Sequence, residues 1–301
     1  MADEKSVNFY LEEPLRTSAA KGEHNFINQV IAVLERSGFD VAFDALPIKG
    51  TPTSDHSISH MVSPPNEKGL MIRRVYHYPF WQIEAVAQRW HWDVAKAGFR
   101  PNEASPDAPR FYRFWQKRLF GDAPHNTSRD GFVYVPLQGK LDQRRLFQSC
   151  TPLEMIEHCL AHDPDRKVIA ALHPKERYDR PELAKLTALE RQHRNLTVDT
   201  GNMERHLRNC DYVVTQNSGA AFSGYFFGKP ALLFGKIDFH HIAEVADKGA
   251  LGNSFARVAN HSPPYAKYIH WFWQEQSINA GRADVQDKIA RRLLRFGWDI
   301  K

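Results

Sequence analysis

The spacing of apolar residues in the C-terminal half of the chain alternates between two patterns. Short apolar runs with the length of buried strands occupy residues 132–137, 167–172, 196–198, 212–215 and 230–234. Helical spacing lies between them, at residues 151–161, 181–193, 203–209 and 218–227. Strands that alternate with helices form doubly wound parallel sheets, which bind ligands at the carboxyl ends of their strands. The pattern therefore predicts an α/β fold with such a sheet in this half.

The N-terminal half is less regular. A strand, a helix and a strand that open a βαβ unit are predicted at residues 7–11, 23–36 and 39–45. Residues 48–69 are rich in Pro, Ser, His and Thr, which predicts a loop, and residues 70–76 predict another strand. The aromatic-rich residues 81–98 predict a helix packed into a core, and residues 265–298 predict a final helical region.

Pro, Asn, Asp and Gly interrupt residues 100–129, and this interruption separates two domains of ordinary size. We expect an N-terminal α/β lobe at residues 1–125 and a Rossmann-like lobe at 126–262. Residues 263–301 are expected to form helices that pack back on the N-terminal lobe.

Composition narrows the class of protein. The 301 residues carry a formal charge of +5, which suits nucleic acid, an anionic membrane surface or an anionic substrate, but the absence of a block of five like charges argues against nucleic acid. The chain has no basic start followed by an apolar run and no stretch of about 18 apolar residues. Its sequence therefore predicts neither export nor a membrane span. Three cysteines without a Cys-x-x-Cys pair predict neither a disulfide framework nor a zinc ribbon, which suits the cytoplasm.

The strand at 212–215 is followed by Gln216, Asn217, Ser218 and Gly219, which open a helix of small residues. Free backbone N–H groups and the positive end of a helix dipole stabilise an anion such as phosphate at such a turn. The alternative is a Ser or Asn that only caps a buried helix.

A second segment, His173, Pro174, Lys175 and Arg177, directly follows the strand at 167–172. A histidine at a strand end followed by two cations can face the phosphate and ribose of a nucleotide. The alternative is a structural or solvated histidine.

The loop after residues 132–137 contains Gln138, Lys140 and Asp142. A carboxylate there can act as nucleophile, as base or as stabiliser of positive charge at a sugar carbon. The alternative is a loop carboxylate that pairs with Lys140 or Arg144.

Glu23, His24 and Asn25 stand between the first predicted strand and helix. If the two lobes face each other across a cleft, this turn offers acceptor-side contacts; the alternative is that Asn25 or Glu23 caps the helix. No metal site is expected, because the histidines lack a second ligand set and Asp163-Pro164-Asp165 is typical of a turn.

Together, Gln138 to Asp142, His173-Pro174, Gln216-Asn217-Ser218 and Gly228-Lys229-Pro230 resemble the bacterial capsule polysaccharide biosynthesis family that includes β-Kdo transferases. The resemblance covers mainly residues 131–235. It implies a GT-B fold with two Rossmann-like lobes, binding of CMP by the His-Pro and Asn-Ser elements, and Asp142 as the nucleophile of a retaining transfer. The chain departs from the family at Gly219, where threonine is frequent, and at Gln143, where serine is frequent.

The sequence thus predicts a metal-independent glycosyltransferase without a cofactor. The resemblance implies a CMP-activated acidic sugar such as CMP-Kdo as the donor and a glycan or glycolipid as the acceptor. The protein is expected in the cytoplasm, with peripheral association at the inner membrane. The alternatives are a non-catalytic glycan- or nucleotide-binding protein of the same fold, and a nucleotide-sugar epimerase or hydrolase.

Overall fold

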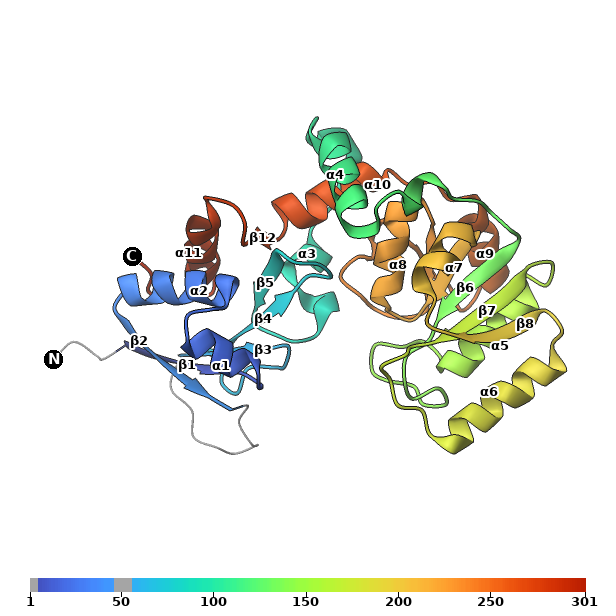
Figure 1. Ribbon diagram of the computed structural model, residues 1–301, viewed down its shortest axis with the longest axis horizontal. Helices are drawn as coiled ribbons and strands as arrows, with labels where there is room; N and C mark the ends of the chain where they lie inside the picture. Colours follow the sequence, from blue (N-terminus) through green and yellow to red (C-terminus); the bar gives the residue numbers. More distant parts are fainter. Residues whose placement is uncertain (1–4, 46–55) are drawn as a thin grey trace. The chain divides into compact units, whose positions relative to one another are not determined.

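The computed structural model describes residues 5–45 and 56–301, and contacts divide the chain into two compact units (Figure 1). Unit 1 comprises Met1–Ala97 and Trp271–Lys301, and unit 2 comprises Gly98–His270. The sequence-based boundaries lie at 125 and 262 instead. Residues 98–125 join unit 2 because Tyr112 and Gln116 hydrogen-bond the carbonyls of Tyr225 and Phe226, at 2.6 and 2.7 Å.

Unit 1 is built on a six-stranded sheet in the order β12-β5-β4-β3-β1-β2. The strands β1 to β4 pair in parallel, β5 is antiparallel to β4, and β12 is antiparallel to β5. The strands are β1 Lys5–Tyr10, β2 Phe39–Asp44, β3 His56–His60, β4 Leu70–Arg74, β5 Phe80–Glu84 and β12 Ile278–Asn279. The helices are α1 Leu15–Ala20, α2 Asn25–Arg36, α3 Asp93–Lys96 and α11 Val285–Arg295. The apolar faces of α2 and α11 share one core with the sheet, which includes Val7, Phe26 and Ile289.

Unit 2 contains a six-stranded parallel sheet in the order β11-β10-β9-β6-β7-β8. Its strands are β6 Phe132–Pro136, β7 Lys167–Leu172, β8 Leu196–Thr200, β9 Tyr212–Thr215, β10 Ala231–Leu233 and β11 Glu244–Val245. Its helices are α4 Ala108–Phe120, α5 Pro152–His162, α6 Arg180–Gln192, α7 Met203–Asn209, α8 Gly219–Gly224, α9 Leu251–Asn260 and α10 Tyr265–His270. The prediction of a doubly wound parallel sheet in this half is confirmed.

Two predictions for the N-terminal half are wrong. The helix expected at 81–98 is replaced by β5, a 3-10 turn and the four-residue α3. All five residues of β5 are buried, and Trp81 stacks on Phe26 of α2 at 4.7 Å, so the expected burial of these aromatics is achieved by a strand inside the sheet and not by a helix. Within the loop expected at 48–69, residues 56–60 form β3, while residues 48–55 lie outside the described part.

The expected helical region at 265–298 is interrupted. After α10, the turn Trp271–Glu275 is π-helical, and Ile278 and Asn279 then pair with Trp81 and Phe80 of β5. Residues 271–301 therefore complete the sheet and the core of unit 1. In the described residues, no helix combines the length and apolar character that a membrane span requires.

Candidate functional site

The strand order of unit 2 creates a switch point between β6 and β9. These two strands pair through Val133 with Tyr212 and Tyr134 with Val213. From β6 the chain proceeds to β7 and β8 on one side, and from β9 to β10 and β11 on the other. In open α/β sheets of this order, ligands bind outside the carboxyl ends of the two strands at the switch point. Two of the three segments singled out in the sequence follow β6 and β9, and the third follows the adjacent β7.

The segment after β9 is largely buried. Ser218 caps α8, because its Oγ accepts a hydrogen bond from the N–H of Ala220 at 3.2 Å, and its own N–H donates to Thr215 Oγ1 at 3.3 Å. Gln216 is 4% exposed and donates from Nε2 to the carbonyl of Cys150 at 2.9 Å. Asn217 and Gly219 are half-buried beside them. Ser218 is therefore the N-cap of the six-residue helix α8, as the capping alternative proposed.

The segment after β7 is exposed at His173, Pro174, Lys175 and Arg177. Its turn is held by the backbone N–H of His173, which donates to the Tyr178 hydroxyl at 2.8 Å. The Nδ1 atom of His173 accepts from the N–H of Lys175 at 3.2 Å. The side chains of this segment are available to a ligand at the same edge of the sheet.

The loop after β6 contacts the β7 loop through Gly139. A Cβ atom at this position would lie 2.9 Å from Glu176 Oε2 and 3.5 Å from the carbonyl oxygen of Arg177, so glycine permits the close approach. Lys140 follows with φ of 64°, a left-handed conformation, and is exposed, while Gln138 is half-buried.

Asp142 belongs to the same loop and pairs with neither Lys140 nor Arg144. Its Oδ2 lies 2.6 Å from Lys185 Nζ on α6, and its side chain is 26% exposed. The hydrogen bond from Lys185 lowers the pKa of the Asp142 carboxyl and raises the pKa of Lys185. The neighbouring backbone is fixed to the same helix, because the N–H of Leu141 donates to Glu182 Oε1 at 2.7 Å. The carboxylate is therefore ionised and held at the carboxyl end of β6.

Two further residues at the switch point, Arg145 and Gln148, were missed in the sequence. The Nε and Nη2 atoms of Arg145, Nε2 of Gln148 and Oε1 of Gln216 are buried and have no hydrogen-bond partner among the described residues. Burial lowers the pKa of Arg145, with Glu176 acting against this effect. All three side chains line a pocket of about 10 Å³ between β6 and β9, together with Gln138. Buried polar groups without partners are costly, so their concentration here indicates a site that a polar ligand or water completes.

No sequence motif signals Arg145 and Gln148, because their position depends on a long-range contact. Gln148 forms an antiparallel bridge with Gly235, after β10. The N–H of Ser149 donates to the carbonyl of Phe234 at 2.8 Å, which aligns the loop with β10. A Cβ at Gly235 would lie 2.6 Å from the carbonyl oxygen of Gln216, so this glycine lets the three segments meet.

The acceptor-side candidates lie in unit 1, and there the expected cap is wrong in detail. The segment follows the short helix α1 rather than β1. His24, and neither Glu23 nor Asn25, caps α2, with its Nδ1 accepting from the N–H of Ile27 at 3.2 Å. Burial lowers the pKa of His24. Asn25 donates to the Tyr78 hydroxyl at 2.8 Å, and Glu23 is exposed.

Metal-ligating side chains do not gather in the structure. Residues 5–45 and 56–301 contain no group of three or more His, Cys, Asp or Glu side chains placed to hold a metal ion. Asp163 of the Asp-Pro-Asp turn pairs with Arg166 at 2.9 Å and accepts from the Tyr212 hydroxyl.

Two α/β units of this kind define the GT-B class of fold. The chain belongs to the family of capsule polysaccharide biosynthesis proteins, whose model matches residues 108–264. It is similar in fold to the β-Kdo 2,7 transferase of KpsC from Thermosulfurimonas dismutans, with a TM-score of 0.52, 11% identity and coverage of 88% of this chain and 89% of that chain. The β-Kdo 2,4 transferase of the same KpsC gives a TM-score of 0.51 and 13% identity, with the same coverage. None of the curated proteins matches the chain by sequence.

Proposed function

We propose that the chain is a glycosyltransferase that binds a nucleotide-sugar donor at the carboxyl edge of the unit 2 sheet. The acceptor is a glycan or glycolipid, and the product is part of a capsular or surface polysaccharide. The observation that carries the proposal is the switch point between β6 and β9, where the loop with Asp142 meets the unpartnered groups of Arg145 and Gln216. Membership of the capsule biosynthesis family supports this reaction class.

The donor we propose is a CMP-activated acidic sugar such as CMP-Kdo. The similar KpsC structures are named as β-Kdo transferases, and this supports a Kdo donor. The single phosphate of CMP would be bound by N–H donors of Arg145 and by His173 and Lys175, since charge-assisted hydrogen bonds stabilise a leaving phosphate. Arg177 and Lys140 are exposed at the same edge and would neutralise the sugar carboxylate. The nucleotide would contact the backbone of Gly219 and the side chains of Asn217 and Ser218.

Asp142 is proposed to act at the anomeric carbon. A carboxylate nucleophile must be ionised, as an aspartate is near neutral pH, and the hydrogen bond from Lys185 lowers the pKa of Asp142 further. One oxygen of Asp142 would bond to the anomeric carbon as the CMP phosphate leaves with the bonding electrons. An acceptor hydroxyl would then displace Asp142 and lose its proton to solvent, which gives a retaining transfer. Protonation of the leaving phosphate is not needed for CMP, so this mechanism assigns no separate general acid.

The proposal is tested with a panel of nucleotides and with transfer from CMP-Kdo. CMP is expected to raise the melting temperature more than CDP, UDP, GDP or ADP, with or without a chelator, because only a ligand that binds the folded state shifts the transition. Transfer is then measured on an acidic glycan acceptor. Equal shifts for all nucleotides, or a CMP shift lost with the chelator, contradict the proposed donor site.

A second function, non-catalytic binding of a nucleotide or glycan, is favoured by one observation. Lys185 lies 2.6 Å from the proposed nucleophile, and a tightly paired carboxylate is a weaker nucleophile than a free one. CMP binding without transfer or donor hydrolysis, for several acceptors, would establish this second function.

A further inference from the structure

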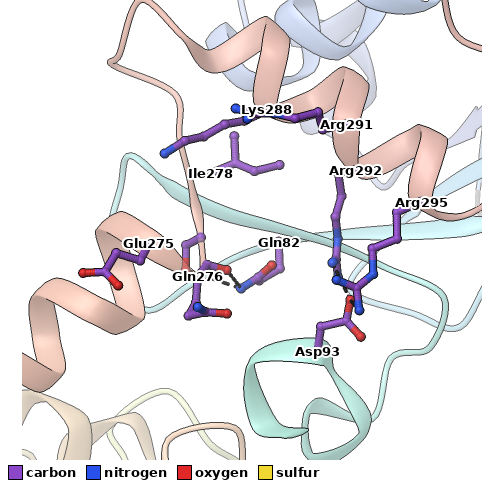
Figure 2. Close-up of a pocket in the computed structure, with 10 residues that line it drawn as sticks. Gln82, Asp93, Glu275, Gln276, Ile278, Lys288, Arg291, Arg292 and Arg295 are labelled. Carbon is purple, nitrogen blue, oxygen red and sulfur yellow. Dashed lines mark hydrogen bonds and ion pairs between the residues drawn. The ribbon is translucent and has the colours of Figure 1, made fainter. Parts of the chain in front are cut away.

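Unit 1 contains a larger pocket that is separate from the switch point. Its volume is about 380 Å³, and it lies between α11, β5 and the segment before β12 (Figure 2). Gln276 and Ser277 of its wall come immediately before β12. Asn25, by contrast, donates to the carbonyl of Ala280 immediately after β12. The pocket and the acceptor-side turn therefore lie at opposite ends of this strand.

One face of α11 supplies four cations to the pocket. Lys288, Arg291, Arg292 and Arg295 follow the helical spacing i, i+3, i+4 and i+7, so they form one stripe. Like charges at this spacing destabilise a helix unless a group of opposite charge lies nearby. The helix dipole stabilises cations in the last turn, and this accounts for Arg292 and Arg295. It does not account for Lys288, which lies nearer the start of the helix.

Two carboxylates, Asp93 and Glu275, line the pocket with these four cations, so its lining carries more positive than negative charge. Asp93 is shared, because Arg292 and Arg295 both extend from α11 toward it (Figure 2). Arg292 also pairs with Glu84 at 2.7 Å, behind the pocket. Lys288 lies 3.7 Å from Asp284 of the preceding turn and also donates to the carbonyl of Gln274, at 3.2 Å. The Nε atom of Arg291 donates to the carbonyl of Asp287 at 3.3 Å, which leaves the rest of its fork directed to solvent or ligand.

The shape and chemistry of the walls indicate the ligand. A volume of this size is typical of small-molecule sites and accommodates a sugar unit. Gln276 supplies an amide group that can hydrogen-bond sugar hydroxyls, whereas Gln82 and Ser277 are each 3% exposed and already donate to the carbonyls of Gln276 and Phe272. Lys288 and Arg292 are recessed, with side chains 21% and 14% exposed. Arg291 and Arg295 are exposed, so it is the two recessed cations and the volume of the pocket that favour a saccharide over a flat lipid surface.

We propose that this pocket binds an acidic saccharide unit, with its carboxylate or phosphate held by Arg291, Arg295 and Lys288. The site would hold a negatively charged glycan on unit 1 at a place other than the acceptor-side turn. It does not depend on the identity of the donor, since no residue of unit 2 lines it.

The test measures binding of trigalacturonate and glucose 6-phosphate to the full-length protein by calorimetry. Maltotriose and glucose serve as the matched neutral ligands. The double variant Arg291→Gln/Arg295→Gln is compared with Arg282→Gln, an exposed residue outside the pocket. Wild type and Arg282→Gln are expected to bind at least one anionic probe, and the double variant to bind it at least about tenfold more weakly, since charge-assisted hydrogen bonds are lost. Circular dichroism and thermal unfolding verify that each variant is folded.

Four outcomes overturn the proposal. The first is absence of binding of both anionic probes at millimolar concentration. The second is equal binding of the neutral saccharides, and the third is an equal loss in Arg282→Gln. The fourth is binding of phosphatidylglycerol vesicles alone, which would assign the cations to a membrane surface. If wild type does not bind CMP, the proposed donor site is contradicted. The test of this pocket is unaffected, because it measures binding of the anionic probes.

Discussion

Asp142 Oδ2 lies 2.6 Å from Lys185 Nζ, so an ion pair joins the loop after β6 to α6. Both side chains are partly exposed, at 26% and 56%, and ion pairs in contact with solvent contribute little to stability. The pair is therefore better explained by its effect on the carboxylate, whose pKa it lowers and whose position it fixes. This distinction can be tested, since either partner can be changed separately.

Asp142→Asn is expected to abolish transfer and to retain CMP binding. Asparagine keeps the shape but cannot attack the anomeric carbon, so kcat should fall at least about a thousandfold with little change in affinity. Lys185→Gln breaks the same ion pair and keeps the carboxylate, so it should retain most of the activity. Kinetics with CMP-Kdo and calorimetry with CMP measure both variants. An equal fall of kcat in the two variants would mean that transfer depends on the ion pair and not on a nucleophilic carboxylate.

Arg145→Gln is expected to weaken CMP binding without loss of stability. The guanidinium is half-buried and has two N–H groups without partners, so its removal relieves desolvation in the free protein. The loss of a charge-assisted hydrogen bond to phosphate costs about 1.5–3 kcal/mol of binding. Arg144→Gln is the matched control, because Arg144 is the exposed neighbour. Thermal unfolding and CMP titration check both; an equal effect on affinity in the two variants would contradict a specific role.

Ser218→Ala and His173→Ala should separate a structural residue from an exposed one. Ser218 is buried and caps α8, so the alanine variant should lose about 1 kcal/mol of stability even without nucleotide. His173 is exposed, and its replacement should leave the free energy of unfolding within about 0.5 kcal/mol and weaken CMP binding. Denaturant unfolding with and without CMP measures both effects. If His173→Ala destabilises the free protein and leaves the affinity unchanged, its role is structural.

Most of the sheet of unit 2 could be predicted because five of its six strands are separate apolar runs between helical segments, whereas the two-residue β11 is not such a run. Parallel pairing then requires that the loops after β6, β7 and β9 share one edge, so the neighbourhood of Asp142, His173 and Ser218 was readable as well. Strand order was not readable. Strand order determines that β6 and β9 are neighbours, and hence that Arg145 and Gln148 line the same pocket as Gln216.

Unit 1 was less predictable for two physical reasons. The strand β5 is buried at every position, so it lacks the polar alternation that identifies a half-exposed strand. The two-residue strand β12 is defined only by its pairing with Phe80 and Trp81, almost 200 residues earlier in the chain. Neither its pairing nor the pocket beside α11 leaves a local signal.

Glu84 gives unit 1 a pH-dependent stability whose sign can be derived. The residue is 3% exposed, and burial raises the pKa of its carboxyl to about 7, although Arg292 acts against this rise. Between the ordinary pKa of 4.5 and about 7, the folded protein holds a proton that the unfolded chain has released. The free energy of unfolding therefore falls as pH rises through this range. A shift of this size corresponds to about 3 kcal/mol, present in full below the lower value and lost above the upper one.

Glu84→Gln removes this titration and keeps the shape of the side chain, so the variant should lack this contribution to the pH dependence. His77, whose pKa burial lowers to about 4, contributes a slope of opposite sign, but it contributes equally to both proteins and cancels in their difference. Denaturant unfolding between pH 4.5 and 7.5 is followed by tryptophan fluorescence, because six of the seven tryptophans lie in unit 1. Wild type should lose about 3 kcal/mol relative to the variant across that range. A difference that does not vary with pH would mean that Glu84 is ionised throughout, held so by Arg292.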